Sequence, residues 1–149
     1  MFFDTHSHLN FPQFAADLPS VIARARQNKV SDILVVGTDA ASNRRAVEIA
    51  AEHKLWASLG FHPSDIETNN PALPGAEGLT GESRVVAVGE VGLDFACAVD
   101  RSRQIAAFRG FLETAKTLGL PVIVHSRDAA DDTLRALRHA GPVPGVWHC

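Results

Sequence analysis

The chain has 149 residues, of which 46% are hydrophobic and 21% charged, and this composition fits one globular domain over residues 1–149. A formal net charge of −3 excludes a broadly basic surface, so salt-driven binding along a nucleic-acid backbone is not expected. No apolar run is long enough to cross a membrane. A polar DTHSHLN segment interrupts any apolar leader, and two distant cysteines fit a reducing compartment, so we expect a cytoplasmic location and no defined protein partner.

Short apolar runs rich in β-branched residues alternate along the chain with stretches of helical periodicity. The predicted strands are 2–8, 32–37, 55–63, 85–94, 121–127 and 145–149, and the predicted helices are 18–29, 40–54, 101–119 and 128–141. Asp128 is a start signal for the last helix, and Gly119 and Gly141 are stop signals. This rhythm predicts a parallel α/β sheet. The segment 64–83, rich in Pro, Gly and Asn, is predicted to be a long surface connection bordering a site.

The first predicted strand ends in an unusual polar pattern. Asp4, His6 and His8 alternate with smaller residues, and residues at i and i+2 of a strand share a face. Two imidazoles so placed can reach one divalent metal, and the aspartate can join or orient them. Taken alone, the pattern fits equally well a polar strand end whose histidines cap backbone groups.

Later strand ends repeat this feature, and the repetition favours a shared site. The polar residues at or beyond these ends are His62, Glu90, Asp94, His125, Arg127 and His148. Side chains at the carboxyl ends of parallel strands converge on substrate or metal, so separate capping roles explain the repetition poorly.

Imidazole and carboxylate donors together favour a divalent ion such as zinc or manganese, and Glu90 can bridge two ions. Such paired ions suit the hydrolysis of esters and phosphodiesters. Ser126 beside His125 is a poor nucleophile candidate, because adjacent strand residues point to opposite faces. Arg127 could clamp a phosphate or pair with a barrel carboxylate, and Asp94 could act as a base, hold a ligand in place or start a turn.

The motifs DTHSHL, GFHP, GEVGLD, PVIVHSRDA and GVWHC, in this order, resemble the TatD family of metal-dependent hydrolases. The resemblance implies a (β/α)8 TIM barrel, two divalent ions (Mg, Mn or Zn) and deoxyribonuclease activity with exonuclease action. It implies that His6 and His8 bind one metal, that Glu90 bridges two, and that His125 and His148 bind the second. It places His62, Asp94 and Arg127 around the substrate, with Glu90 and Asp94 as the catalytic carboxylates.

Two departures from the family pattern qualify these expectations. The stretch FACAVDRSRQ keeps Phe95 and Gln104 but lacks the arginine that the family has nearby. The sequence also stops inside the GVWHC motif, before the family's late Glu-Thr-Asp segment. Six strands cannot complete an eight-stranded barrel, so we expect an incomplete barrel with unpaired edges at its first and sixth strands and weak or no hydrolysis.

Other functions compatible with these residues are a metal-binding fragment without turnover, and an ester hydrolase of the D-aminoacyl-tRNA deacylase kind. DNA or a small phosphodiester or ester is therefore the expected substrate. A classical amidohydrolase with a carbamylated lysine on strand four is disfavoured, because Glu90 stands there and Lys29, Lys54 and Lys116 lie in or beside predicted helices.

Overall fold

A computed structural model of the chain describes residues 1–66 and 84–148, so most of the predicted 64–83 connection lies outside the described residues. The elements are β1 (Phe2–Ser7), η1 (Pro12–Phe14), α1 (Leu18–Gln27), β2 (Val30–Val36), α2 (Ala40–His53), β3 (Trp56–Leu59), η2 (Pro63–Asp65), β4 (Val85–Asp94), α3 (Arg101–Leu118), β5 (Val122–Arg127), α4 (Ala130–Ala140) and β6 (Gly145–His148). No described helix is both long and apolar enough to span a membrane.

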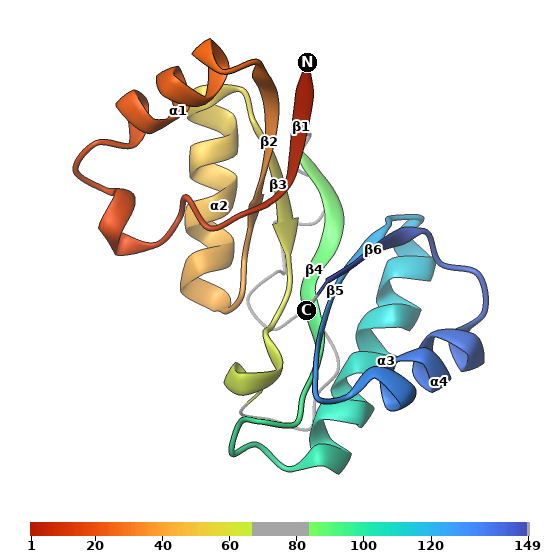
Figure 1. The fold of residues 1–149 in the computed structure, drawn as a ribbon. Coiled ribbons are helices and arrows are strands. Elements are labelled where there is room, and N and C mark those ends of the chain that lie inside the picture. Colours follow the sequence, from red (N-terminus) through yellow and green to blue (C-terminus); the bar gives the residue numbers. More distant parts are fainter. Residues whose placement is uncertain (67–83, 149) are drawn as a thin grey trace.

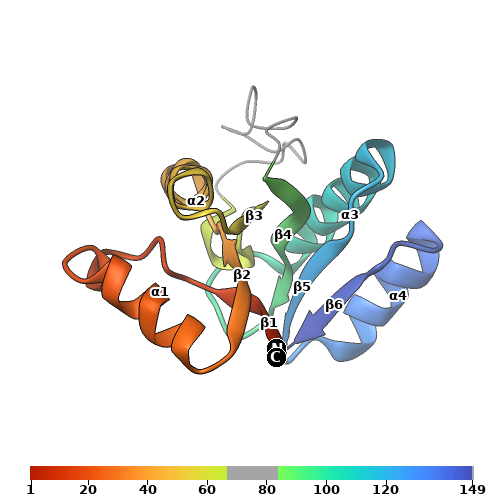
Figure 2. The ribbon, with the colours of Figure 1, turned by 90° about the horizontal axis from the view of Figure 1, so that it is seen from above.

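All six strands are parallel and follow one another in the sheet in chain order, β1 to β6. The sheet curves into a nearly closed barrel with the four α-helices around its outer side (Figures 1 and 2). The predicted parallel α/β fold and the incomplete barrel are thus confirmed. Because all strands run the same way, their carboxyl ends meet at one rim.

Alternate residues of one strand enter different parts of the core, as the two-residue period of a strand requires. In β2, Ile33 and Val35 are buried in a cluster with Ile49 of α2, whereas Leu34 and Val36 belong to an inner cluster with residues of β4 and β5. A larger cluster joins β4 and β5 to Phe108 and Phe111 of α3. Burial on both faces explains why the strands read as nearly continuous apolar runs.

The outer strands of the sheet, β1 and β6, each pair on one side only in the described part of the chain. Four large apolar side chains on them are exposed: Phe2 (65%), Phe3 (48%), Trp147 (46%) and Val146 (40%). The two predicted unpaired edges are therefore confirmed, and they carry apolar surface rather than the charges that usually protect an edge.

The helix ends partly follow the predicted signals. Gly119 (φ 67°) ends α3 and Gly141 ends α4 as predicted. Asp128 does not cap α4, because its backbone lies in the left-handed region (φ 53°) and Ala129 occupies the capping position without a side-chain bond. The strongest cap is Asp39 at α2, whose carboxylate accepts from two backbone N–H groups.

Candidate metal centre

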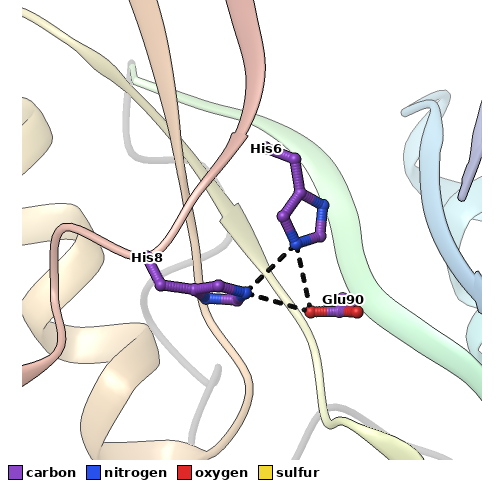
Figure 3. Close-up of side chains that lie close together, drawn as sticks. All are labelled: His6, His8 and Glu90. Atoms are coloured by element: carbon purple, nitrogen blue, oxygen red, sulfur yellow. Dashed lines mark hydrogen bonds and ion pairs between the residues drawn. The ribbon is translucent and has the colours of Figure 1, made fainter. Parts of the chain in front are cut away.

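The end of β1 and the middle of β4 bring two histidines onto one carboxylate oxygen. His6 Nε2 lies 3.3 Å and His8 Nε2 3.4 Å from Glu90 Oε2. The two ring nitrogens are 3.1 Å apart. Figure 3 shows both rings turned toward the Glu90 carboxylate. The predicted pairing of His6 with His8 is therefore present, with Glu90 as its third member.

The other oxygen of the same carboxylate faces the last two strands. His125 Nδ1 on β5 lies 2.9 Å from Glu90 Oε1, and His148 Nε2 on β6 lies 3.1 Å from it. The Glu90 side chain is only 4% exposed. One buried carboxylate therefore joins two sets of donors, which we call the first donor set (His6, His8, Glu90) and the second donor set (Glu90, His125, His148).

The spacing within both donor sets fits a divalent ion. Adjacent ligand atoms about 2.0–2.2 Å from an ion lie roughly 2.8–3.1 Å apart around an octahedral ion and roughly 3.3–3.6 Å apart around a tetrahedral one. The donor–donor distances given above span 2.9–3.4 Å. His148 Nε2 is buried and close to Glu90, yet no hydrogen bond satisfies it. Within the described residues this nitrogen is unsatisfied, and a divalent ion held by His148 and Glu90 would satisfy it.

Close contacts with the backbone just beyond β2 and β3 position Glu90 among the histidines. Its N–H donates to the carbonyl of Gly37, just beyond β2. On the next strand, a Cβ built on Gly60 would come 2.5 Å from the Glu90 carbonyl oxygen. Only glycine allows the end of β3 to approach so closely, so the GFHP motif has a packing role in addition to carrying His62.

The electrostatics of the centre keep Glu90 ionised and two of its neighbours neutral. Burial alone would raise the pKa of Glu90, but hydrogen bonds from His125, His6 and His8 outweigh burial and hold that pKa well below its ordinary value. Burial, reinforced by neighbouring histidine charge, lowers the pKa of His62 and His148. A neutral imidazole is the form that ligates a metal or offers a neutral N–H.

His62 reaches the same space from the turn after β3, where its ring centre lies 4.4 Å from that of His125. His62 Nδ1 lies 3.2 Å from the backbone N–H of Ser64 and 2.6 Å from Ser64 Oγ. These contacts engage the Nδ1 side of the ring, so Nε2 is the nitrogen left for a substrate or an ion.

The other residues considered in the sequence lie outside the two donor sets. Asp94 is buried (5% exposed), and its Oδ2 lies 3.4 Å from His125 Nε2. Arg127 is exposed at the end of β5. Asp4 does not join the donors, because its Oδ1 accepts from the backbone N–H of His6 at 3.1 Å. Ser126 bonds to Thr133 of α4 at 3.0 Å, on the face away from His125, as the alternation rule predicted.

Two buried side-chain amides hold strand ends in place. Neither was predicted from the sequence as a site residue. Asn43 of α2 donates to the carbonyl of Gly60 and accepts from its N–H, both at 3.1 Å. Gln104 of α3 makes the same pair of bonds to Asp94, at 2.9 and 2.8 Å. Each is a polar residue on the apolar stripe of its helix, and this signal could have revealed them.

The donors line an open hollow of about 480 Å³ at the barrel rim. Its lining residues are His6, His8, Phe11, Thr38, His62, Ser64, Asp65, Glu90, His125 and His148. Asp94 and Arg127 are not among them. The hollow lies within the size range of small-ligand sites.

Comparison with known proteins agrees with this geometry. The family model "TatD related DNase" matches residues 3–149. The uncharacterized metal-dependent hydrolase YabD of Bacillus subtilis is 40% identical over 156 residues, which cover 100% of this chain and 60% of that protein. The 3'-5' ssDNA/RNA exonuclease TatD of Klebsiella pneumoniae is 38% identical over 152 residues, covering 99% and 58%. The chain thus spans 58–60% of the length of these curated relatives.

Solved structures show the same fold. YjjV, a TatD homolog from Escherichia coli, superimposes with a TM-score of 0.83 at 34% identity, over 93% of this chain and 56% of that chain. A TatD family hydrolase from Entamoeba histolytica gives a TM-score of 0.86 at 23% identity, over 99% and 57%.

Proposed function

This chain belongs to the family of TatD-related DNases, and from this premise we propose that it hydrolyses phosphodiester bonds with divalent metal, removing nucleotides from the 3′ end of single-stranded DNA. The observation that carries the proposal is the convergence of four histidines, His6, His8, His125 and His148, on the two oxygens of Glu90. The relatives described above, a metal-dependent hydrolase and a single-strand exonuclease, support the same reaction class.

In this proposal the first and second donor sets would each hold one divalent ion. A mixture of imidazole and carboxylate suits zinc or manganese better than magnesium, which prefers oxygen ligands. When bound, such ions polarise the phosphoryl group and make an attacking water more acidic. Glu90 would serve both ions, which requires it to be ionised; without ions the hydrogen bonds from its histidine neighbours keep its pKa low, and bound ions would replace those hydrogen bonds in stabilising the carboxylate.

His62 is assigned to the substrate. His62 lines the same hollow as the donor sets, and in the tautomer with its proton on Nε2 it would donate to a non-bridging phosphate oxygen. Burial, followed by the charge of His125, lowers the pKa of His62, so the ring donates as a neutral group near neutral pH. Arg127, exposed at the end of β5, is available to contact the phosphate backbone outside the hollow.

The size and charge of the site favour the end of a strand as substrate. A hollow of about 480 Å³ suits one nucleotide. The net charge of −3 provides no extended basic track for a duplex. Recognition would therefore depend on the reacting nucleotide and the metal centre, which is the requirement of an exonuclease acting on a free end.

The proposal is tested by measuring metal content and cleavage on the same purified chain. The substrate is a 5′-labelled single-stranded oligonucleotide, with and without a blocked 3′ end, in the presence of manganese or zinc. The variants are His6→Ala and Glu90→Ala, and the matched control is His139→Ala, an exposed histidine on α4. Because the barrel is incomplete, we expect slow stepwise shortening of the open-ended oligonucleotide, lost in both site variants and on addition of EDTA but kept in the control.

Three results would contradict the proposal. Bound metal without cleavage would indicate a metal-binding chain without turnover, and cleavage of an aminoacyl ester but not of DNA would assign the site to ester hydrolysis. A wild-type chain that binds no divalent ion at micromolar concentration would refute the metal centre itself.

A further inference from the structure

His125 lies between two carboxylates that approach opposite ring nitrogens. Nδ1 is 2.9 Å from Glu90 Oε1, and Nε2 is 3.4 Å from Asp94 Oδ2. The three side chains are 14%, 4% and 8% exposed, respectively. If Nδ1 ligates an ion in the second donor set, Nε2 must carry the ring proton. Asp94 Oδ2 makes an ion-pair contact with Nε2, which has no hydrogen bond in the described part of the chain, so Asp94 is the carboxylate placed to accept that proton.

Asp94 is itself held from three directions. Its Oδ1 accepts from the backbone N–H of Ala96 at 2.9 Å. Its own N–H and carbonyl pair with the side-chain amide of Gln104, which is fully buried. The same amide also donates to the carbonyl of Val99 at 2.9 Å, closing the turn after β4. With Oδ1 engaged, Oδ2 is the oxygen that remains for His125.

We propose that Asp94 is a positioning residue, locked by Gln104, which fixes the ring orientation and tautomer of His125 for the second donor set. A carboxylate behind a metal-bound histidine holds the ring and makes it a better ligand. Asp94 does not line the hollow, so it acts through His125 and has no contact with substrate. The inference rests on the proposed function in one respect, namely that the second donor set holds an ion.

A different reading would make His62, Asp94 and His125 ligands of a separate ion, because their donor atoms also lie within 4.8 Å of one another. The chemistry of His125 argues against this, because a neutral imidazole offers one lone pair and carries its proton on the other nitrogen. Since Nδ1 faces Glu90 in the second donor set, Nε2 is left to donate to Asp94 and cannot ligate a separate ion. The geometry therefore favours a positioning role for Asp94.

The test is Asp94→Asn, measured by zinc titration calorimetry. The new side chain keeps an oxygen for Ala96 N–H, so its amide nitrogen is turned toward His125 Nε2. An N–H at that position favours the opposite tautomer, in which the proton occupies Nδ1 and blocks ligation. We expect one zinc ion to bind about 10–100-fold more weakly and the other to be unaffected. Asp100→Asn is the matched control, because Asp100 caps the start of α3 and asparagine caps equally well.

A spectroscopic readout separates positioning from general loss of structure. In the zinc-loaded wild type, long-range ¹H–¹⁵N spectra should show His125 protonated at Nε2. This signal should disappear in Asp94→Asn while the urea unfolding midpoint stays close to that of Asp100→Asn. Gln104→Met, which keeps the size of the side chain but loses its amide, should weaken the same zinc ion by a smaller factor.

The possible outcomes distinguish failure of this inference from failure of the proposed function. Two zinc ions bound by Asp94→Asn with affinities within about twofold of the wild type would overturn the inference and leave the proposed function standing. Loss of the same ion in His62→Gln would also overturn it, since Asp94 would then be a ligand. A wild-type chain without zinc would overturn both.

Discussion

The substitution Asn43→Ala tests whether the buried amides anchor the strand ends. Asn43 is fully buried, and its amide satisfies both the N–H and the carbonyl of Gly60. Removing the amide leaves these two backbone groups without a partner, and each such group costs about 1–3 kcal/mol. A water molecule in the vacated space would recover part of this, so we expect the free energy of unfolding to fall by about 2–4 kcal/mol.

Such a loss is large compared with the roughly 5–15 kcal/mol of a typical domain. It is measured by urea unfolding, followed through the fluorescence of Trp56 and Trp147 in the presence of EDTA. Asn28→Ala is the matched control, because Asn28 is exposed and makes one side-chain bond, to Arg24 at the end of α1. We expect this control to lose less than about 1 kcal/mol.

The variant Asn43→Asp sharpens the test. Aspartate is nearly the same size and can still accept from Gly60 N–H, but it cannot donate to the carbonyl and would bury a charge. Its loss should equal or exceed that of Asn43→Ala. A loss below about 0.5 kcal/mol for alanine, or equal losses at Asn43 and Asn28, would refute the anchoring role.

Three further predictions follow from the site. Gly92→Ala should lower the free energy of unfolding in urea by at least about 2 kcal/mol, because φ is +145° and the new Cβ would meet the carbonyl oxygen of His125. A variant as stable as the wild type would show that β4 and β5 can move apart at this point. Without metal, the unfolding midpoint should fall as the pH drops below about 6.5, because burial lowers the folded-state pKa of His62 and His148, so that the unfolded chain takes up protons first. Glu90 acts in the same direction below about pH 4.5, since its folded-state pKa is also depressed and the unfolded chain protonates first. A midpoint independent of pH between 7.5 and 5 would contradict the histidine statement, and one independent of pH between 5 and 3 would contradict the statement on Glu90. Under the proposed function, His62→Gln should lower kcat/KM about 10–100-fold with unchanged metal content, since a hydrogen bond to a charged group contributes about 1.5–3 kcal/mol. If the metal content falls in parallel with kcat/KM, His62 is a metal ligand instead.

The strands and the donors at their ends could be predicted because apolar runs, and polar residues at the ends of those runs, recur along the sequence. The β4 run matches its predicted range of 85–94, and the apolar period of α3 defines that helix to within one residue. Glu90, His125 and His148 could be brought together in advance because parallel strands place their carboxyl ends at one rim. Convergence at that rim follows from direction alone and needs no knowledge of side-chain rotamers.

Orientation within the site could not be predicted in this way. Strand alternation placed Asp4 beside His6, but the pairing of β1 with β2 shifts register after Asp4, and its carboxylate turns to the backbone. The two ring nitrogens of His125 contact carboxylates on β4, and the Gln104 side chain bonds to the backbone of Asp94 ten residues away. All of these are tertiary contacts between different elements. A single sequence carries no periodic signal for such contacts.

Because strand order follows chain order, the two donor sets are completed at different stages of synthesis. The first donor set is complete once β4 has been synthesised, because its members come from β1, the residue just beyond it, and β4. The second donor set waits for β5 and β6. Since synthesis delivers the amino-terminal strands first, an ion captured by the first set would hold β1 to β4 while the later strands are still being made. Metal supply during translation would then influence how much nascent chain reaches the folded state.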